Sequence, residues 1–334
     1  MNKKVRWGVI GAAKIAVEKV IPAMQQGEWS EIVAIASRDS EKARRFASDL
    51  QIPKVYGSYE ELLADSEIEA VYNPLPNHLH VPWTMKAAAA GKHVLCEKPL
   101  ALTIADAQKL LAAQRQAKVK IQEAFMVRTH PQWLAVLDLI KNGRIGKLGA
   151  INGFFSYFNR DVRNIRNQPE MGGGALLDIG CYPIFTSRLV FGEEPRRVVA
   201  LTERDPEMRV DRLDSVILDF PSGQANFVCG TQLVPYQRMQ FFGSTGRIEV
   251  EIPFNIPIDK PTRIYIDDGS DLYGGKIETI EFAPANQYTI QGDLFSKAVR
   301  ENGETVISLE NSINNMAVIA AVFRSAESGK WEAL

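Results

Sequence analysis

The chain has 334 residues, and its 39 basic and 40 acidic side chains give a formal net charge of -1. A near-neutral chain without a basic stripe is not typical of nucleic-acid-binding proteins, so we expect no nucleic-acid partner. The composition, 46% hydrophobic and 24% charged, is that of a globular protein, and the length exceeds that of one typical domain.

The basic N-terminus is followed by apolar residues and superficially resembles a signal peptide, but Lys14 and Glu18 interrupt it. No stretch approaches the roughly 20 apolar residues that a transmembrane helix needs, so we expect no membrane association. The cysteines Cys96, Cys181 and Cys229 are far apart and odd in number. This spacing argues against a disulfide framework and favours a cytoplasmic location.

The first 123 residues alternate strand-like and helix-like segments. Continuous apolar strands separated by helices indicate a parallel sheet covered on both faces. Right-handed crossovers then make a doubly wound, Rossmann-type sheet the expected topology. The expected strands are 5–11, 31–37, one near 55, 68–73, 92–98 and 119–124, and the expected helices are 14–26, 40–50, 59–65, 80–91 and 103–116.

From residue 124 onward, long runs alternate apolar and polar residues, as antiparallel strands with one exposed face do. The sequences DFPSGQANF and GSTGR are typical of hairpin turns. We therefore expect two domains, 1–123 and 124–334, the second being α+β with a large, mostly antiparallel open sheet. Such a sheet has an apolar face or edges to cover, so we expect a homodimer or homotetramer formed through it. Helices are expected at 131–142, 176–191 and 309–328.

The turn after the first strand carries small residues at Gly11, Ala13 and Ala16. The dinucleotide fingerprint is G-x-G-x-x-G/A, in which small residues let the backbone approach a pyrophosphate at a helix N-terminus. Ala13 departs from that pattern, and small residues after a strand also serve tight packing. The strand–turn–helix context favours a nucleotide site, to which we assign Gly11, Ala13, Lys14 and Ile15.

The end of the second strand bears on which dinucleotide is bound. Folds that bind NAD usually place an acidic residue there, whereas folds that bind NADP place an arginine near the 2′-phosphate. This strand ends in Ser37 and Arg38, and a guanidinium suits phosphate. We therefore expect NADP, with NAD as the alternative because Asp39 and Glu41 are close. The other interpretation is that Arg38 is an ordinary solvated charge.

Four segments together resemble the glucose-fructose oxidoreductase/inositol dehydrogenase (Gfo/Idh/MocA) family of two-domain dehydrogenases over nearly the whole chain. They are GVIGAAKIA in the first turn, NPLPNHLH at 73–80, GKHVLCEKP at 91–99 and GGGALLDIG at 172–180. The resemblance implies an NAD(P)-binding domain followed by a domain that binds substrate and forms the oligomer.

The resemblance also implies roles for residues of the first domain. Pro76, Asn77 and His80 match a loop that lies along the cofactor. Glu97 and Lys98 begin the E-K-P element, in which the lysine contacts the nicotinamide ribose and the reacting oxygen of the substrate.

In the second domain, the resemblance implies that Asp178 binds substrate hydroxyls and that Arg128 lies near the substrate. We also assign Arg128 to the cofactor-binding residues. Tyr182 stands where inositol-dehydrogenase-like members have histidine, as in the branch that oxidises sugars and dihydrodiols. Tyrosine, with a pKa of about 10, is a poor base at neutral pH, and a nearby ammonium such as Lys98 favours the phenolate. We hypothesise that Lys98 polarises the substrate oxygen, Tyr182 transfers the proton and Asp178 orients the substrate.

Structural roles are the alternatives: Tyr182 as a half-buried aromatic residue and Asp178 as a helix cap. Pro183 predicts that both lie in or just before the first turn of a helix. Arg160, Arg163 and Arg166, in the loop before the triple glycine, are either solvated or in contact with substrate. The four histidines form no metal-binding pattern, so no metal is expected.

The function expected from these features is NADP-dependent hydride transfer to or from the carbinol or carbonyl of a sugar, as in an aldose 1-dehydrogenase. The alternatives are a trans-dihydrodiol dehydrogenase or a 1,5-anhydrofructose reductase, each acting on a cyclic alcohol or keto-sugar. A non-catalytic NAD(P)-binding regulator is the alternative from a different class.

Overall fold

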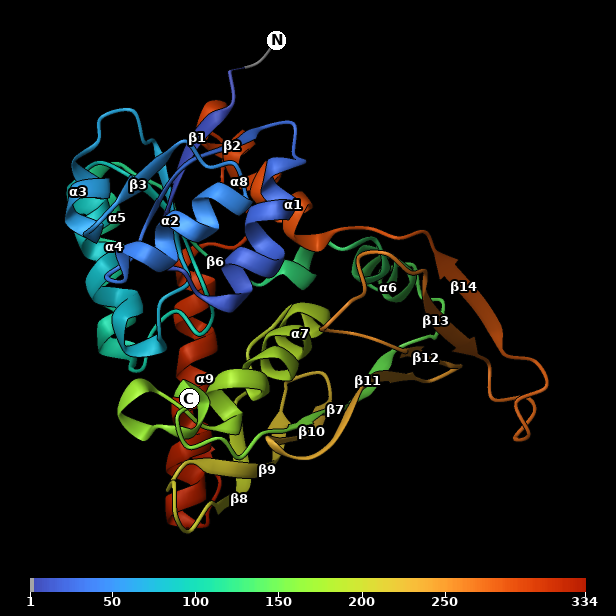
Figure 1. The fold of residues 1–334 in the computed structure, drawn as a ribbon. Helices are drawn as coiled ribbons and strands as arrows, with labels where there is room; N and C mark the ends of the chain where they lie inside the picture. Colours follow the sequence, from blue (N-terminus) through green and yellow to red (C-terminus); the bar gives the residue numbers. More distant parts are fainter. Residues whose placement is uncertain (1–2) are drawn as a thin grey trace. The chain divides into compact units, whose positions relative to one another are not determined.

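The computed structural model describes residues 3–334 as two compact units, which are considered separately (Figure 1). The first unit comprises the N-terminal segment to Met126 together with Asn286–Met316. The second unit comprises Val127–Ala285 and Ala317–Leu334. No helix of the described residues is both long and apolar enough to cross a bilayer.

A six-stranded sheet in the order β3-β2-β1-β4-β5-β6 forms the centre of the first unit. Every neighbouring pair is parallel, and the order reverses beside β1, as in a doubly wound fold. The expected Rossmann topology is therefore confirmed. The strands are β1 (Val5–Ile10), β2 (Ser30–Ala36), β3 (Lys54–Tyr56), β4 (Ala70–Asn73), β5 (His93–Cys96) and β6 (Ile121–Glu123). The helices are a π-helix (Ala16–Val20) continuing into α1 (Ile21–Gln25), α2 (Ser40–Asp49), α3 (Tyr59–Ala64), α4 (His80–Ala89) and α5 (Ile104–Ala117).

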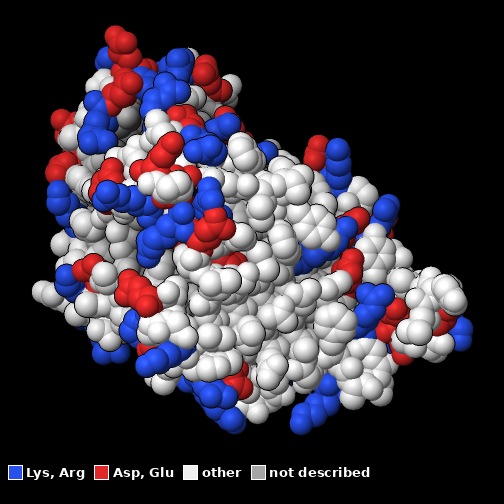
Figure 2. Space-filling view, turned by 90° about the horizontal axis from the view of Figure 1, so that it is seen from below, with Lys and Arg blue, Asp and Glu red and all other residues white. Residues whose placement is uncertain are grey.

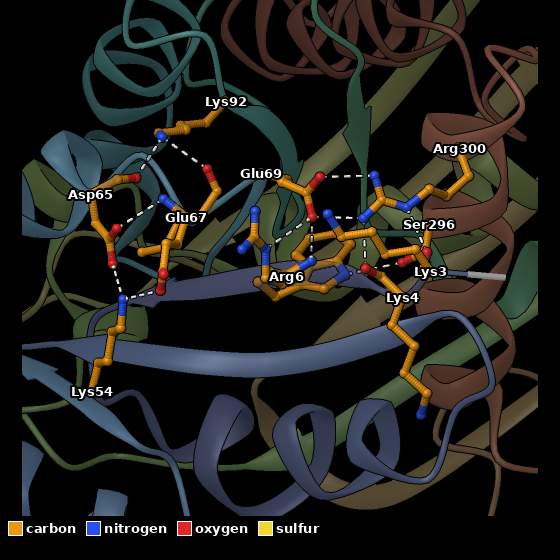
Figure 3. Close-up of polar contacts among 12 residues, drawn as sticks. Lys3, Lys4, Arg6, Lys54, Asp65, Glu67, Glu69, Lys92, Ser296 and Arg300 are labelled. Carbon is orange, nitrogen blue, oxygen red and sulfur yellow. Dashed lines mark hydrogen bonds and ion pairs between the residues drawn. The ribbon is translucent and has the colours of Figure 1, made fainter. Parts of the chain in front are cut away.

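Helix α8 (Gln287–Arg300) belongs to the first unit although it lies far along the chain. The fully buried Trp7 donates from its indole nitrogen to Ser296 Oγ at 3.0 Å. Arg300 donates to both carboxylate oxygens of Glu69, at 2.8 and 2.6 Å (Figure 3). The expected single boundary between residues 123 and 124 differs from this division, because these long-range contacts leave no local pattern in the sequence.

A nine-stranded sheet in the order β14-β13-β12-β11-β7-β10-β9-β8-β15 forms the second unit. Only β7 and β10 pair in parallel, so the expected mostly antiparallel open sheet is confirmed. The strands are β7 (Leu148–Phe158), β8 (Arg197–Arg204), β9 (Asp211–Asp219), β10 (Gln224–Gly230), β11 (Gln232–Gly243), β12 (Arg247–Val250), β13 (Thr262–Asp267), β14 (Glu278–Phe282) and β15 (Glu332–Ala333). The helices are α6 (Pro131–Lys141), α7 (Cys181–Phe191) and α9 (Leu309–Ser328), the last of which is divided between the units.

The two faces of this sheet differ. Side chains such as Phe155 and Phe227 are buried on the face that α7 and the π-helix before it cover. The opposite face, called the outer face below, exposes apolar side chains such as Leu201 (76%) and Ile217 (41%). Figure 2, a view from below, shows a broad surface with few charged residues.

Candidate active site

The first turn of the Rossmann unit has the geometry that a dinucleotide phosphate needs. Gly11 has a φ of +108°, and its amide donates to Ala36 O at 2.8 Å, which binds the turn to the end of β2. The helix begins where Val17 N bonds Ala13 O at 3.1 Å, so the amides of the first helical turn are unpaired within the helix. These features fit a pyrophosphate at the helix N-terminus.

The three other residues of this turn have distinct surroundings. Ala16 is fully buried, so its small size serves the packing of the helix on the sheet. Ile15 is partly buried, whereas Lys14 is exposed and pairs with Glu18 at 3.9 Å. Lys14 is thus a surface lysine beside the turn.

The end of β2 presents a hydroxyl and a guanidinium. Ser37 is buried, and its Oγ accepts from Asp39 N at 3.2 Å. Asp39 caps helix α2 by accepting from Lys42 N at 2.9 Å. Arg38 is exposed between them. The nearby carboxylate of Asp39 is therefore used for capping, and the positive charge of Arg38 faces solvent.

His80 connects two loops that follow strands β4 and β5. Its Nδ1 lies 2.7 Å from Pro99 O and its Nε2 lies 2.7 Å from Leu75 O. Burial lowers the pKa of His80 to about 4, so the ring is neutral; it donates to one of these carbonyls and only contacts the other. With both nitrogens directed at protein carbonyls, His80 orders the loops that carry Pro76, Asn77 and Lys98.

Glu97 and Lys98 directly follow β5. Tyr72 donates from its hydroxyl to Glu97 Oε1 at 2.6 Å, and burial, followed by Glu97, raises the pKa of Tyr72 well above its usual value. The Lys98 amide donates to Glu97 Oε2 at 3.4 Å, and the next peptide bond, to Pro99, is cis. Lys98 itself is partly buried, at the carboxyl edge of the parallel sheet where ligands bind in this fold.

Asp178 and Tyr182 lie on consecutive turns of one helical segment. Asp178, 8% exposed, belongs to a π-helix (Leu176–Gly180) that continues into α7. Tyr182, 4% exposed, packs against the rings of Phe155 and Phe254 with centroid distances of 5.9 and 5.3 Å.

Pro183 is the third residue of α7, so Asp178 lies just before the first turn of that helix and Tyr182 lies within it, as Pro183 predicts. The π-helix and α7 together span the helix expected at 176–191.

The sequence patterns missed Tyr157 as a partner of Asp178 and left the role of Arg166 open. Tyr157 donates from its hydroxyl to Asp178 Oδ2 at 2.6 Å, and Arg166 donates from Nε to the same oxygen at 2.9 Å. Asp178 raises the pKa of Arg166, while burial and then Asp178 raise the pKa of Tyr157. The Arg166 side chain nevertheless remains 44% exposed.

The remaining candidates have separate surroundings. Arg128 is partly buried in a short 3₁₀ turn, and burial lowers its pKa. His130 caps α6 through Nδ1, which accepts from Gln132 N at 3.3 Å. Arg160 and Arg163 form exposed pairs with acidic side chains. Among residues 3–334, no group of three or more metal-ligating side chains is arranged to hold an ion.

The predicted residues therefore fall into two sets, one in each unit. In the first unit they follow the carboxyl ends of parallel strands, which meet at one edge of the sheet. In the second unit, Asp178 and Tyr182 share one helical segment above the buried face of the sheet. The first set is Gly11, Ala13, Lys14, Ile15, Ser37, Arg38, Pro76, Asn77, His80, Glu97 and Lys98, and the second is Arg128, Asp178 and Tyr182.

A Rossmann unit joined to an open-sheet unit defines a class of two-domain NAD(P)-dependent oxidoreductases. Residues 5–125 match the model of an oxidoreductase family with an NAD-binding Rossmann fold, and residues 133–249 match a Gfo/Idh/MocA C-terminal domain. The chain belongs to the Gfo/Idh/MocA family of oxidoreductases, as its sequence motifs predict.

Individual relatives match over nearly their whole length. An uncharacterized oxidoreductase of Rhizobium meliloti is 49% identical over 98% of both chains. An NADP⁺-dependent D-xylose 1-dehydrogenase of Haloferax volcanii is 38% identical over 97% of this chain and 98% of its own. The crystal structure of a 3-ketoreductase from Actinomadura kijaniata with NADP and TDP-benzene superposes with a TM-score of 0.90, at 30% identity and covering 97% and 98% of the two chains.

Proposed function

We propose that this protein is an NADP-dependent oxidoreductase that transfers a hydride between the nicotinamide and a carbinol or carbonyl carbon of a sugar, most similar in action to an aldose 1-dehydrogenase. The observation that carries the proposal is the cluster of Asp178, Tyr157 and Arg166 beside Tyr182, which combines hydroxyl-binding groups with a proton donor and acceptor. The full-length similarity to a D-xylose 1-dehydrogenase supports a sugar as the substrate class.

The preference for NADP is supported by the end of β2. Arg38 is exposed there, and the nearest acidic residue, Asp39, caps α2 instead of facing a ribose. A guanidinium recognises a 2′-phosphate through charge-assisted, forked hydrogen bonds. The relatives named with NADP support the same choice.

The chemistry divides between cofactor and protein. When bound, the nicotinamide supplies the hydride acceptor or donor. Oxidation also requires that the substrate hydroxyl lose a proton, and we assign that transfer to Tyr182. To Lys98 we assign a hydrogen bond to the reacting oxygen. Asp178, which accepts bonds from Tyr157 and Arg166, holds a neighbouring substrate hydroxyl in place.

A panel of substrates with the Tyr182→Phe variant tests the proposal. Reduced-nicotinamide absorbance is followed with aldoses, cyclic diols and keto-sugars, using NADP⁺ and NADPH. We expect turnover of at least one sugar by the natural protein and a drop in kcat of about 100-fold or more in the variant, since one proton-transfer group typically contributes 10²–10⁴-fold.

Tyr236→Phe is the matched control, because Tyr236 is 48% exposed on β11 and its ring packs edge-on against Phe154. Near-normal turnover by Tyr182→Phe would remove Tyr182 from the mechanism. Turnover restricted to a dihydrodiol or to anhydrofructose would select one of those alternatives. Tight NADPH binding without turnover of any substrate would favour a regulator.

We also propose that the protein acts in the cytoplasm as a homodimer or homotetramer. Cys96, Cys181 and Cys229 are buried and form no disulfide bond, as a reducing compartment favours. The exposed apolar side chains of the outer face, among them Leu201 and Ile217, support association through the sheet.

A further inference from the structure

Two acidic residues near the start of strand β9, Asp211 and Asp214, are buried together. Arg204 pairs with Asp211 whereas Glu203 pairs with Leu213, so β9 holds one extra residue and forms a β-bulge. In a regular strand, residues three apart face opposite sides of the sheet. The bulge lets both carboxyl groups turn to the same side, where Asp211 is 2% and Asp214 0% exposed.

Asp211 holds the beginning of the helical segment that carries Asp178 and Tyr182. Its Oδ2 accepts from Leu176 N, the first residue of the π-helix, at 2.7 Å. Its Oδ1 fills the space at Gly174, where a Cβ would collide with it and where φ is +117°. The triple-glycine turn and the helix start are therefore built around this carboxyl group.

Asp214 receives hydrogen bonds from both neighbouring strands. Thr202 donates from Oγ1 to Asp214 Oδ1 at 2.6 Å, and Cys229 donates from Sγ to Oδ2 at 3.6 Å. The bulge therefore places two carboxyl groups on one buried side of the sheet, each held by donors from the protein. Ionised carboxylates only accept hydrogen bonds and repel each other, so one proton shared between the two groups would relieve that repulsion.

The surrounding charges are consistent with a singly protonated pair. On Asp211, burial raises the pKa, while the Leu176 amide and the charge of Arg204 oppose that effect. Burial and then Asp211 raise the pKa of Asp214 to about 8. Burial raises the pKa of Cys229 well above its usual value, so its thiol adds no charge. These directions favour a pair that holds one proton and one negative charge.

We propose that Asp211 and Asp214 form a proton-sharing pair that positions the glycine turn and the helix bearing Asp178 and Tyr182. The effect of this pair on catalysis rests on the function proposed above. Loss of the shared proton leaves two adjacent buried carboxylates that repel each other. The Asp211 carboxylate then moves relative to Leu176, and the helical segment that carries Asp178 and Tyr182 loses its fixed position.

The central test compares the full-length protein with Asp214→Asn. A carboxamide imitates the protonated acid, since it donates to Asp211 and accepts from Thr202, but it does not ionise. The ratio of natural to variant kcat is measured from pH 6 to 10. We expect a ratio within about threefold of 1 at pH 7 that falls at least about fivefold above pH 8, because only the natural pair loses its proton.

Hydrogen exchange of the amides in residues 172–182 gives a readout that is independent of activity. Corrected for intrinsic exchange rates, protection should fall above pH 8 in the natural protein and stay constant in Asp214→Asn. Thr202→Val keeps both acids but removes a donor that favours ionised Asp214, so the same transition should move to higher pH. This second variant carries the test if Asp214→Asn does not fold.

The outcomes separate the two proposals. Identical pH profiles and identical exchange in the natural protein and the variants would overturn the proton-sharing pair, even with normal sugar turnover. The expected exchange transition without turnover of any substrate would support the pair and refute the proposed function.

Discussion

At the scale of residues, the charge of Asp178 determines what the proposed substrate site recognises. Its Oδ2 accepts from Tyr157 and from Arg166, and the guanidinium favours the ionised carboxylate. An ionised carboxylate only accepts hydrogen bonds, so Asp178 selects donors such as sugar hydroxyls. The Arg166 side chain, 44% exposed, lies beside it.

Asp178 and Arg166 should therefore act as one unit. Asp178→Asn and Arg166→Gln should each lower kcat/KM by about 10- to 100-fold, and the double variant should be little worse than either, because each single change already breaks the pair. A double-mutant cycle under steady-state conditions measures this. Arg163→Gln, whose exposed partner is Asp161, is the control with unchanged kinetics. If the fold-losses in kcat/KM of the two single variants multiply in the double variant, the two residues act independently.

Arg38 should set the cofactor preference. Arg38→Gln removes the charge, and a charge-assisted hydrogen bond is worth about 1.5–3 kcal/mol, so the KM for NADP should rise about 10- to 100-fold. The KM for NAD should stay within about threefold, because NAD lacks the 2′-phosphate. Arg45→Gln, a second basic residue of the same region on α2, serves as the control. Equal changes for both cofactors would exclude Arg38 from phosphate recognition.

At the scale of elements, α8 is held to the Rossmann sheet by a buried indole and an ion-pair cluster. Trp7 bonds Ser296, and Glu69 receives Arg300 and Arg6 together (Figure 3). Burial raises the pKa of Glu69, but the hydrogen bonds from Arg300 and Arg6 outweigh it and lower the pKa to about 2.

Glu69→Gln should lower the free energy of unfolding by about 1–2 kcal/mol at pH 6, after allowance for solvent screening. The carboxylate has a lowered pKa in the folded state, so its stabilisation is complete above its usual pKa of 4.5 and is lost as the pH falls toward 2. The difference between natural protein and variant should shrink accordingly in urea titrations at pH 6, 4 and 3.

Glu60→Gln is the control for that experiment, because Glu60 and its partner Lys86 are 61% and 52% exposed. Exposed pairs contribute roughly 0–1 kcal/mol, so this variant should change stability little at any pH. If Glu69→Gln lowers the free energy of unfolding by the same amount down to pH 3, the stabilisation does not come from the ionised Glu69 carboxylate.

At the scale of the whole molecule, the outer face of the nine-stranded sheet is the surface that a second copy would cover. Leu201 and Ile217 lie on the adjacent strands β8 and β9 and are 76% and 41% exposed. Patches of this kind on soluble proteins usually mark an interface.

The double variant Leu201→Glu/Ile217→Glu should therefore dissociate the oligomer, because association would bury two unpaired charges. Light scattering coupled to size exclusion gives the mass of each form, and we expect a dimer or tetramer for the natural protein and a monomer for the variant. Leu272→Glu is the control, since Leu272 is 97% exposed but lies outside the strands. A natural protein that is monomeric at micromolar concentration would refute the oligomer.

The sequence predicted the parts of the fold that depend on local pattern. Helix 309–328 matches α9 in both bounds, and the hairpin turn expected in DFPSGQANF joins β9 to β10. Helix α8 and strands β13 and β14 were not predicted. Helix α8 packs against residues that are distant in the sequence: Trp7, for example, donates a hydrogen bond to Ser296 of this helix.

By itself, then, the sequence determined the doubly wound topology, the tight turn at Gly11 and the family, because strand periodicity and glycine requirements are properties of contiguous residues. Tertiary structure alone decided that Tyr157 and Arg166 surround Asp178, and that a bulge in β9 brings two acids together beneath the glycine turn. These arrangements depend on strand register and on contacts between residues far apart in the chain, where local pattern carries no information.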